Sequence, residues 1–409
     1  MYIFAELGQL FIYDMTRKRL YIFNPEHDLA LASGESNYMA PASARQMAND
    51  LALLPMWYAD PGNAVLAPSA YNADFLKQMQ VLLHVNVELI TAPEIVNGGS
   101  WEFSPWGYNL ALRKRLLAVG ASPFDLYSEE YVTALRKFSH RLQAVKLLSK
   151  LQLSNCFCGE SFYLENLKEC ESFVIGRPIC ILKAPLSGSG KGLNWCKGQM
   201  TSFISGWCNR VIHSQGGLIG EPVYDKVEDF AMEFYSDGKG KVSFAGYSVF
   251  STNKSGMYLG NELLTDDKMK QRLSKFVPLC ELERLQTRLE EELSALLGSF
   301  YQGYMGVDMM ICHFPNETVV YKIHPCVEIN LRMNMGVVSR LLTDRYIAST
   351  AEGFFRIVYY PIEGVALEEH QKMLATYPLL IEEGRIRSGY LPLVPVSAQS
   401  RYRVFCCCH

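Results

Sequence analysis

Long hydrophobic runs are absent from this sequence of 409 residues. The most apolar stretches, such as residues 51–57, are short and interrupted by proline or charge, well below the roughly 20 residues that a membrane-spanning helix needs. Residues 1–15 lack the basic start and the small-residue cleavage site of a signal peptide. The sequence therefore predicts a cytoplasmic protein without a membrane partner.

An excess of charge of one sign is also missing. Lys and Arg number 39 against 42 Asp and Glu, a net charge of -3, so no basic field attracts a nucleic-acid backbone. Twelve cysteines are present, but no paired CxxC motifs close a zinc site. The tail Cys406-Cys-Cys-His409 is interpreted as a frayed chain end, with a soft-metal site as the alternative.

The chain is long enough for two or three domains, and its hydrophobic fraction of 49% is ample for packed cores. Residues 1–19 precede the first clear apolar strand and are interpreted as an N-terminal extension. Over residues 20–138 short apolar runs alternate with helical spacing, which predicts a parallel, doubly wound α/β sheet.

The pattern changes after residue 139 and is typical of an α+β region with antiparallel strands. The final 50 residues give only weak signals. Between residue 139 and these final residues, we expect helices at 140–151 and 282–300 and strands at 174–183, 304–312 and 319–329. A hairpin is expected at 230–250, with its turn at 237–240.

A glycine-rich loop follows the strand that ends at Lys183. Gly188, Gly190 and Gly192 allow backbone N–H groups to surround phosphate oxygens, and Lys191 adds positive charge. The loop is neither a Walker A motif nor GxGxxG, because its glycine spacing differs from both. An ordinary glycine-rich hairpin is the alternative.

A second group of polar residues lies on two consecutive strands. In the segment 327–332, Glu328, Asn330 and Arg332 alternate with apolar residues and therefore share one face of the strand. Asp308 on the preceding strand can join them, which gives oxygen ligands suited to magnesium. A solvated sheet face is the alternative.

A third, weaker feature is the segment Glu221-Pro-Val-Tyr224, followed by Glu228-Asp229. An extended backbone can offer both an acceptor and a donor to an adenine ring, and Pro222 lacks only the donor. Alone, this segment is better interpreted as an ordinary strand.

In this order, the three features resemble the ATP-grasp superfamily, whose members include D-alanine:D-alanine ligase, biotin carboxylase and glutathione synthetase. The resemblance covers residues 140–345, half of the chain. It implies a parallel α/β domain of the pre-ATP-grasp kind over residues 20–138, followed by a two-lobed ATP-grasp fold. The lobes are expected at 139–220 and 221–345, and 346–409 form a C-terminal extension.

The resemblance also implies roles for single residues. Asp308, Glu328 and Asn330 would hold Mg²⁺, or Mn²⁺ in its place. Asp229, preferred to Glu228, would hold the ribose. The remaining ATP-binding residues would be Arg141, Lys183, Gly188, Ser189, Gly190, Lys191, Glu221, Pro222 and Tyr224. Those acting on the reacting groups would be Arg332, Lys183 and Lys191, with Arg332 near the transferred phosphate or the substrate carboxylate.

The reaction that the resemblance implies is the activation of a carboxylate as an acylphosphate, followed by attack of an amine. A phosphotransferase on the same scaffold and a nucleotide-binding protein without turnover are the alternatives. The partners would be small carboxylates and amines, and whether the chain forms a homo-oligomer stays open. Glu26, His27 and Asp28 follow the first strand and either bind a substrate or cap a helix.

Overall fold

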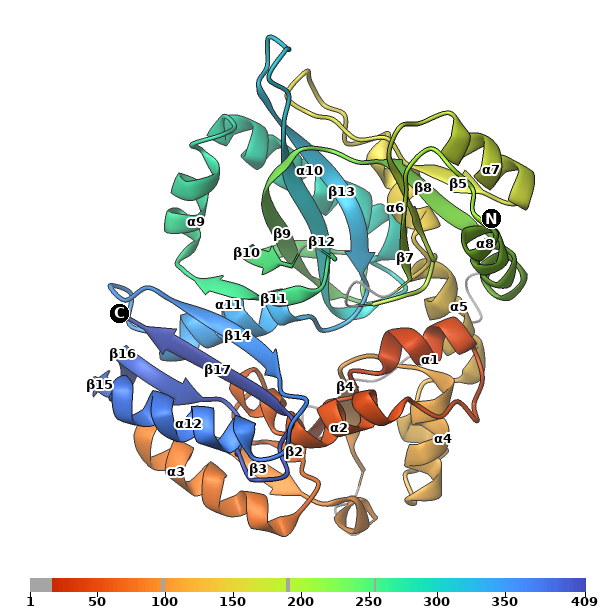
Figure 1. Ribbon diagram of the computed structural model, residues 1–409. Helices are drawn as coiled ribbons and strands as arrows, with labels where there is room; N and C mark the ends of the chain where they lie inside the picture. Colours follow the sequence, from red (N-terminus) through yellow and green to blue (C-terminus); the bar gives the residue numbers. More distant parts are fainter. Residues whose placement is uncertain (1–16, 97–99, 189–191, 254) are drawn as a thin grey trace.

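The N-terminal part of the chain forms a parallel sheet, as predicted. The computed structural model describes residues 17–96, 100–188, 192–253 and 255–409 (Figure 1). The strands β1 (Arg19–Ile22), β2 (Asn63–Leu66), β3 (Val87–Ile90) and β4 (Glu102–Pro105) pair in the order β3-β2-β1-β4, all parallel. The helices of this part are α1 (His27–Ser33), α2 (Ala42–Asp50), α3 (Ala73–Leu83), α4 (Leu110–Ala118) and α5 (Glu129–Phe138).

Both faces of this sheet are buried. Leu20 and Ile22 of β1 pack in one core cluster with Leu112 and Leu116 of α4, while Tyr21 belongs to a second cluster on the other face. Apolar side chains on both faces are the pattern expected of a parallel strand that is covered on both sides. The segment 24–28 therefore leaves β1 at the carboxyl edge of the sheet, where α1 begins.

A small antiparallel sheet follows α6 (Leu142–Leu148). Its order is β5 (Phe162–Leu164), β8 (Leu218–Pro222), β6 (Cys180–Lys183) and β7 (Leu193–Cys196), with α7 (Leu167–Ile175) and α8 (Ser202–Gln215) between strands. The strand predicted at 174–183 is confirmed only over 180–183: residues 174 and 175 end α7, and residues 176–179 connect α7 to β6. Asn166 caps that helix by accepting a 3.0 Å hydrogen bond from the Glu169 backbone N–H, which favours helix over strand here.

The rest of the chain builds one sheet of nine strands. Its order is β13 (Tyr321–Asn330), β12 (Gln302–His313), β9 (Lys226–Asp237), β10 (Val242–Thr252), β11 (Tyr258–Leu263), β14 (Gly353–Tyr359), β17 (Tyr402–Cys408), β16 (Arg385–Pro392) and β15 (Leu380–Glu382). The helices are α9 (Asp266–Leu273), α10 (Leu279–Leu297), α11 (Met335–Tyr346) and α12 (Val365–Thr376). The predicted fold class, a parallel α/β sheet followed by antiparallel sheets, is confirmed. None of the helices in these described residues is long and apolar enough to cross a membrane.

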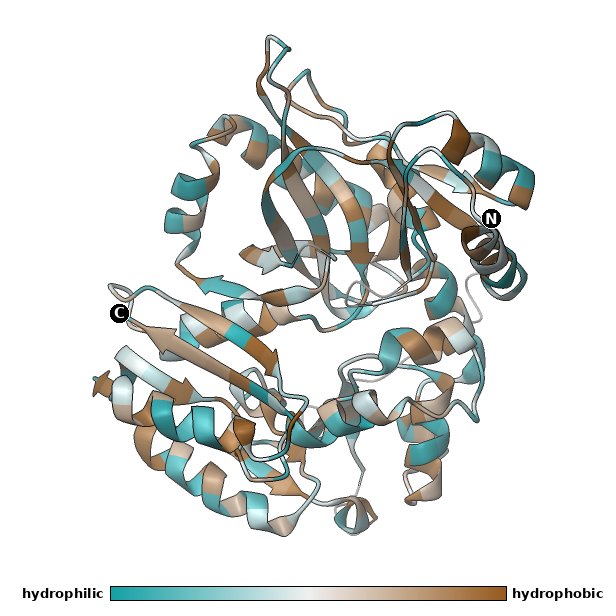
Figure 2. Ribbon diagram, viewed as in Figure 1, coloured by the Kyte–Doolittle hydropathy of each residue, from teal (hydrophilic) through white to brown (hydrophobic). Residues whose placement is uncertain are grey.

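The C-terminus is not frayed. Cys406, Cys407 and Cys408 lie in β17, an interior strand of the nine-stranded sheet, and are buried. Figure 2 shows β17 coloured mostly as hydrophobic. The frayed end expected from the sequence is therefore wrong, because β14 and β16 pair with β17 on its two sides and satisfy its backbone.

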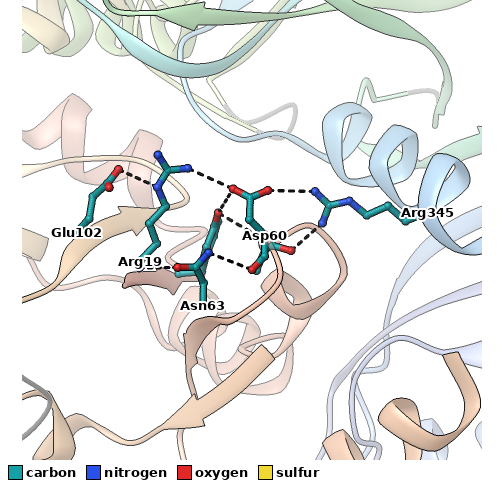
Figure 3. Close-up of polar contacts among 7 residues, drawn as sticks. Arg19, Asp60, Asn63, Glu102 and Arg345 are labelled. Carbon is teal, nitrogen blue, oxygen red and sulfur yellow. Dashed lines mark hydrogen bonds and ion pairs between the residues drawn. The ribbon is translucent and has the colours of Figure 1, made fainter. Parts of the chain in front are cut away.

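Ion pairs connect the parallel sheet to α11 (Figure 3). Asp60 accepts from Arg19 of β1 at 3.2 Å and from Arg345 of α11 at 3.3 Å. Arg345 also donates to the Ala59 carbonyl oxygen at 2.7 Å. None of these residues lines the pocket formed by α1, the segment after β6 and the end of β13, so substitutions in this network can serve as controls for substitutions in that pocket.

Gly336 is a close-packing position at the start of α11. A Cβ at this position would lie 2.0 Å from Glu233 Oε1 and 2.6 Å from Ser248 Oγ. We expect Gly336→Ala to lower the free energy of unfolding by about 2 kcal/mol, because buried groups have to move. Urea unfolding measures this. The control is Gly206→Ala in α8, where the Cβ meets only Arg210 at 3.6 Å and should stabilise by roughly 0.5 kcal/mol. Equal effects of the two changes would contradict the prediction.

Candidate functional site

Four segments far apart in the sequence line one pocket. They are α1, the connection between α5 and α6, the segment after β6, and the end of β13 with the residues that follow it. The lining residues are His27, Asp28, Leu31, Ser139, Pro185, Leu186, Ser187, Glu328, Ile329, Asn330, Leu331 and Arg332. The pocket thus brings the N-terminal domain, the small sheet and the nine-stranded sheet to one place.

The oxygen ligands predicted for magnesium lie together. Asp308 on β12 is directly opposite Glu328 on β13, and Asn330 donates a hydrogen bond to Asp308. Burial, together with the nearby Glu328 and Glu233 carboxylates, raises the pKa of Asp308 to about 8. Among the described residues no group of three or more His, Cys, Asp and Glu side chains is arranged around a metal position. Two carboxylates and an amide oxygen nevertheless form a donor set that suits a hard divalent cation.

Arg141 connects the small sheet to these carboxylates. It stands at the N-terminus of α6, is buried, and donates to Glu328 Oε2 at 2.6 Å. It also donates to the Ser187 hydroxyl at 2.7 Å and to the Ala184 carbonyl oxygen, both in the segment after β6. Local patterns cannot indicate the pairing with Glu328, since the two residues lie 187 positions apart.

Lys183 and Glu221 form a buried ion pair between neighbouring strands of the small sheet. Glu221 also accepts a hydrogen bond of 3.1 Å from the Ser161 hydroxyl. Pro222 ends β8, and the hydroxyl of Tyr224 accepts from the Glu160 N–H at 2.9 Å. The Lys183 ammonium therefore neutralises Glu221 in this structure.

His324 of β13 faces the same region and was not predicted. Its imidazole is buried, and neither ring nitrogen has a hydrogen-bond partner among the described residues. Its ring lies 5.7 Å from that of Tyr224. Burial lowers the pKa of His324 to about 4, so the ring is neutral at neutral pH.

The two acidic candidates for the ribose face opposite sides of β9. Asp229 accepts a 2.9 Å hydrogen bond from Thr252 and also pairs with Lys226. It shares the face of Asp308, because Asp229 is opposite Met310 and Asp308 is opposite Ala231. Glu228 points to the other face, where Arg272 of α9 donates to it at 2.9 and 3.2 Å.

The glycine loop lies only partly within the described residues, and Ser189, Gly190 and Lys191 are outside them. Gly188 is described and lies against α1: a Cβ on it would be 2.1 Å from Asp28 Oδ2. The absence of a side chain at Gly188 therefore allows Asp28 to approach this loop.

Asp28 and Arg332 form an ion pair that the sequence did not predict. Arg332 Nε donates to Asp28 Oδ1 at 2.8 Å and Nη2 to Oδ2 at 2.7 Å. Burial alone would raise the pKa of Asp28, but the charge and hydrogen bonds of Arg332 outweigh burial and hold it below its usual value. Of its neighbours, His27 lines the pocket while Glu26 accepts from Arg115 of α4 at 2.8 Å, away from the pocket lining.

Glu233 is a buried carboxyl group that sequence analysis missed. It accepts hydrogen bonds of 2.9 Å from Asn334, which caps α11, and from the Ser248 hydroxyl. The alternation of β9 places it on the face of Asp229, which is the only sequence signal that could have revealed it. It holds the segment after Arg332 against β9.

Glu233 should make stability depend on pH. Burial raises its pKa from 4.5 to about 7. Between these values the folded protein keeps a proton that the unfolded chain has released, so stability falls as pH rises from about 4.5 to 7, by roughly 3 kcal/mol. Glu233→Gln, whose amide can keep both hydrogen bonds because the Ser248 hydroxyl can also accept, should lack this fall. Urea unfolding of both proteins at pH 5, 6 and 7.5 measures the difference, and parallel pH profiles would contradict the prediction.

Comparisons with known proteins give matches among solved structures alone. No protein-family model matches the chain, and no curated protein matches it. N5-carboxyaminoimidazole synthetase from Staphylococcus aureus, complexed with ADP, is similar with a TM-score of 0.48 and 10% identity, over 96% of this chain and 93% of that one. The biotin carboxylase–β,γ-ATP complex from Campylobacter jejuni gives a TM-score of 0.48 and 12% identity, over 96% and 87%.

A third similar structure is N5-carboxyaminoimidazole ribonucleotide synthetase from Thermus thermophilus, with a TM-score of 0.47 and 12% identity, over 95% of this chain and 93% of that one. A likeness this distant assigns neither a ligand nor a reaction, so the assignment depends on the residues of the site.

Proposed function

We propose that this chain is an ATP- and magnesium-dependent ligase of the ATP-grasp kind, which activates a carboxylate as an acylphosphate and joins it to an amine. The observation that carries the proposal is the meeting of Arg141 with Glu328, 2.6 Å apart. A buried cation at the start of α6 thus lies beside two carboxylates and an amide of the nine-stranded sheet. A site for phosphoryl transfer requires both kinds of group, cations for the phosphates and oxygen ligands for the metal.

The residues divide into three groups around the nucleotide, for the metal, the ribose, and the phosphates with the adenine ring. Asp308, Glu328 and Asn330 would hold Mg²⁺, which when bound neutralises phosphate charge during transfer. Asp229 would hold the ribose. The set assigned to the phosphates and the adenine ring is Arg141, Lys183, Gly188, Ser189, Gly190, Lys191, Glu221, Pro222 and Tyr224.

Arg141 and Lys183 both have carboxylate partners in this structure. Each must exchange its partner, Glu328 or Glu221, for a phosphate oxygen when the nucleotide enters. Binding of a cation by Glu328 would weaken its attraction for Arg141 and favour this exchange. Opening of the Arg141–Glu328 pair would thus link the binding of phosphate by Arg141 to the binding of the metal ion by Glu328.

Arg332 would bind the carboxylate that reacts. A carboxylate oxygen attacks the γ-phosphorus, the bond from that phosphorus to its bridging oxygen breaks, and ADP leaves. The amine nitrogen then attacks the acyl carbon, phosphate leaves, and the nitrogen loses a proton. Arg332 stabilises the anionic oxygens of the first step.

The test is a screen for products from ATP and magnesium with pools of amino acids, small peptides and polyamines. Release of ADP and phosphate in equal amounts, dependent on both an acid and an amine, is the expected result. Formation of ADP and a stable phosphorylated product, without free phosphate, would show that the protein is a phosphotransferase and not a ligase. Binding of a nonhydrolysable ATP analogue without turnover in any pool would contradict an enzymatic role.

A further inference from the structure

The charged side chains that line the pocket occur as compensated pairs. Glu328 is paired with Arg141, and Asp28 with Arg332. His27 adds no charge at neutral pH, because burial lowers its pKa to about 4. The other lining side chains are uncharged: Leu31, Ser139, Pro185, Leu186, Ser187, Ile329, Asn330 and Leu331. The pocket is therefore close to neutral while containing both signs of charge.

The Asp28–Arg332 pair is the part of this arrangement that the proposed nucleotide site does not use. Its two hydrogen bonds are parallel, and the side chains are only 22% and 13% exposed. The third nitrogen of Arg332, Nη1, donates to the Met333 carbonyl oxygen at 3.1 Å. A ligand that takes the two N–H groups facing Asp28, or the two Asp28 oxygens facing Arg332, thus has to displace the partner side chain.

A ligand with one charge would leave one member of the pair without compensation. A simple carboxylate at Arg332 would strand Asp28 in a largely buried site, and a simple amine at Asp28 would strand Arg332. Removing one partner of a buried ion pair is strongly unfavourable. A ligand that carries both charges replaces both halves of the pair and leaves no charge unpaired.

We propose that the carboxylate substrate is an amino acid with a free ammonium group, bound with its ammonium at Asp28 and its carboxylate at Arg332. The inference rests on the proposed function and specifies its acid substrate. Arg332 lies two positions from Asn330 on the lining of the same pocket, so the bound carboxylate is next to the proposed metal ligands. The apolar lining from Leu31, Leu186 and Leu331 favours a small apolar side chain over a charged one.

The first experiment uses the full chain with magnesium and a nonhydrolysable ATP analogue. Calorimetry measures binding of glycine, L-alanine, D-alanine, L-valine and L-leucine. For the tightest of these, the N-acetyl derivative, the amide and the acid without its amino group are measured in the same way. We expect each modified ligand to bind at least about tenfold more weakly, the loss of one charged contact. Equal binding of the acid without its amino group, or no binding of any of the five amino acids, would overturn the inference.

The second experiment separates recognition from stability. Asp28→Asn should reduce the preference for the amino acid over its deaminated acid by about tenfold or more, because Arg332 then lacks its competing carboxylate. Asp60→Asn is the matched control: it removes an ion pair between the N-terminal domain and α11 outside the pocket and should keep the preference. An unchanged preference in Asp28→Asn would show that the pair is structural.

The two proposals fail in different ways. Amino-acid binding with the expected preferences, but without phosphate release, would contradict the proposed ligase function and support the proposed amino-acid site. ATP-dependent turnover of carboxylates that lack an amino group would contradict the proposed amino-acid site and support the proposed ligase function.

Discussion

Glu328→Gln should lower ATP-dependent phosphate release by about 100-fold or more, because it removes one anionic ligand from the proposed magnesium set while keeping the side-chain volume. Glu328 lies directly opposite Asp308 and accepts from Arg141 at 2.6 Å. The neutral amide oxygen can still accept from Arg141, so the fold should survive. The measurement is phosphate release with the substrate pool that supports turnover in the wild type, together with thermal unfolding.

Glu262→Gln is the matched control for this change. Glu262 is a carboxylate on β11 of the same sheet, and Arg356 lies 3.6 Å from it. Because Glu262 is not among the pocket-lining residues, its substitution should leave phosphate release within about twofold of the wild type. If Glu328→Gln also keeps wild-type activity at saturating magnesium, Glu328 is not a metal ligand.

Lys183→Met should reduce both stability and nucleotide affinity. It leaves Glu221, a carboxylate with only 4% of its surface exposed, without its cation, which should cost about 3 kcal/mol of unfolding free energy. The same change removes a cation from the proposed phosphate contacts, so affinity for a nonhydrolysable ATP analogue should fall by roughly tenfold to a hundredfold. Urea unfolding and calorimetry measure the two effects.

The double variant Lys183→Met/Glu221→Gln separates these two causes. Removing the stranded charge should bring stability back to within about 1 kcal/mol of the wild type. Nucleotide affinity should stay low, because the lysine is still missing. Recovery of both would mean that Lys183 serves only to neutralise Glu221. Lys150→Met is a control for lysine loss in general, since the Lys150 side chain is more than half exposed and its pair with Glu292 should contribute less than about 1 kcal/mol.

Local patterns predicted the elements whose partners are close in the sequence. The turn predicted at 237–240 joins β9 to β10, and Asp237 accepts there from the backbone N–H groups of Lys239 and Lys241 at 2.7 and 3.0 Å. The leucine spacing of α10 predicted its buried face, and five of its leucines are almost completely buried. Both patterns depend on backbone geometry within a few residues, which the sequence specifies directly.

Competition between local signals explains the elements that were missed. The apolar run after residue 172 fits a strand, but the Asn166 cap fixes it as the end of α7. The cysteines of β17 show no alternation of apolar and polar residues, because the strand is buried on both faces and its pattern cannot be distinguished from that of a loose apolar tail.

The sequence by itself determined which residues of a strand share a face: alternation placed Glu328 and Asn330 on one side of β13, and a hairpin partner could bring in Asp308, whereas Arg332 lies just beyond the end of the strand. Only the tertiary structure decided which charges meet there. Arg141 pairs with Glu328 across 187 positions and Asp28 with Arg332 across 304, and it is Asp229, not Glu228, that shares the face of Asp308. Spacing along a chain cannot encode such pairs, because domain packing and strand register set the distance between residues so far apart.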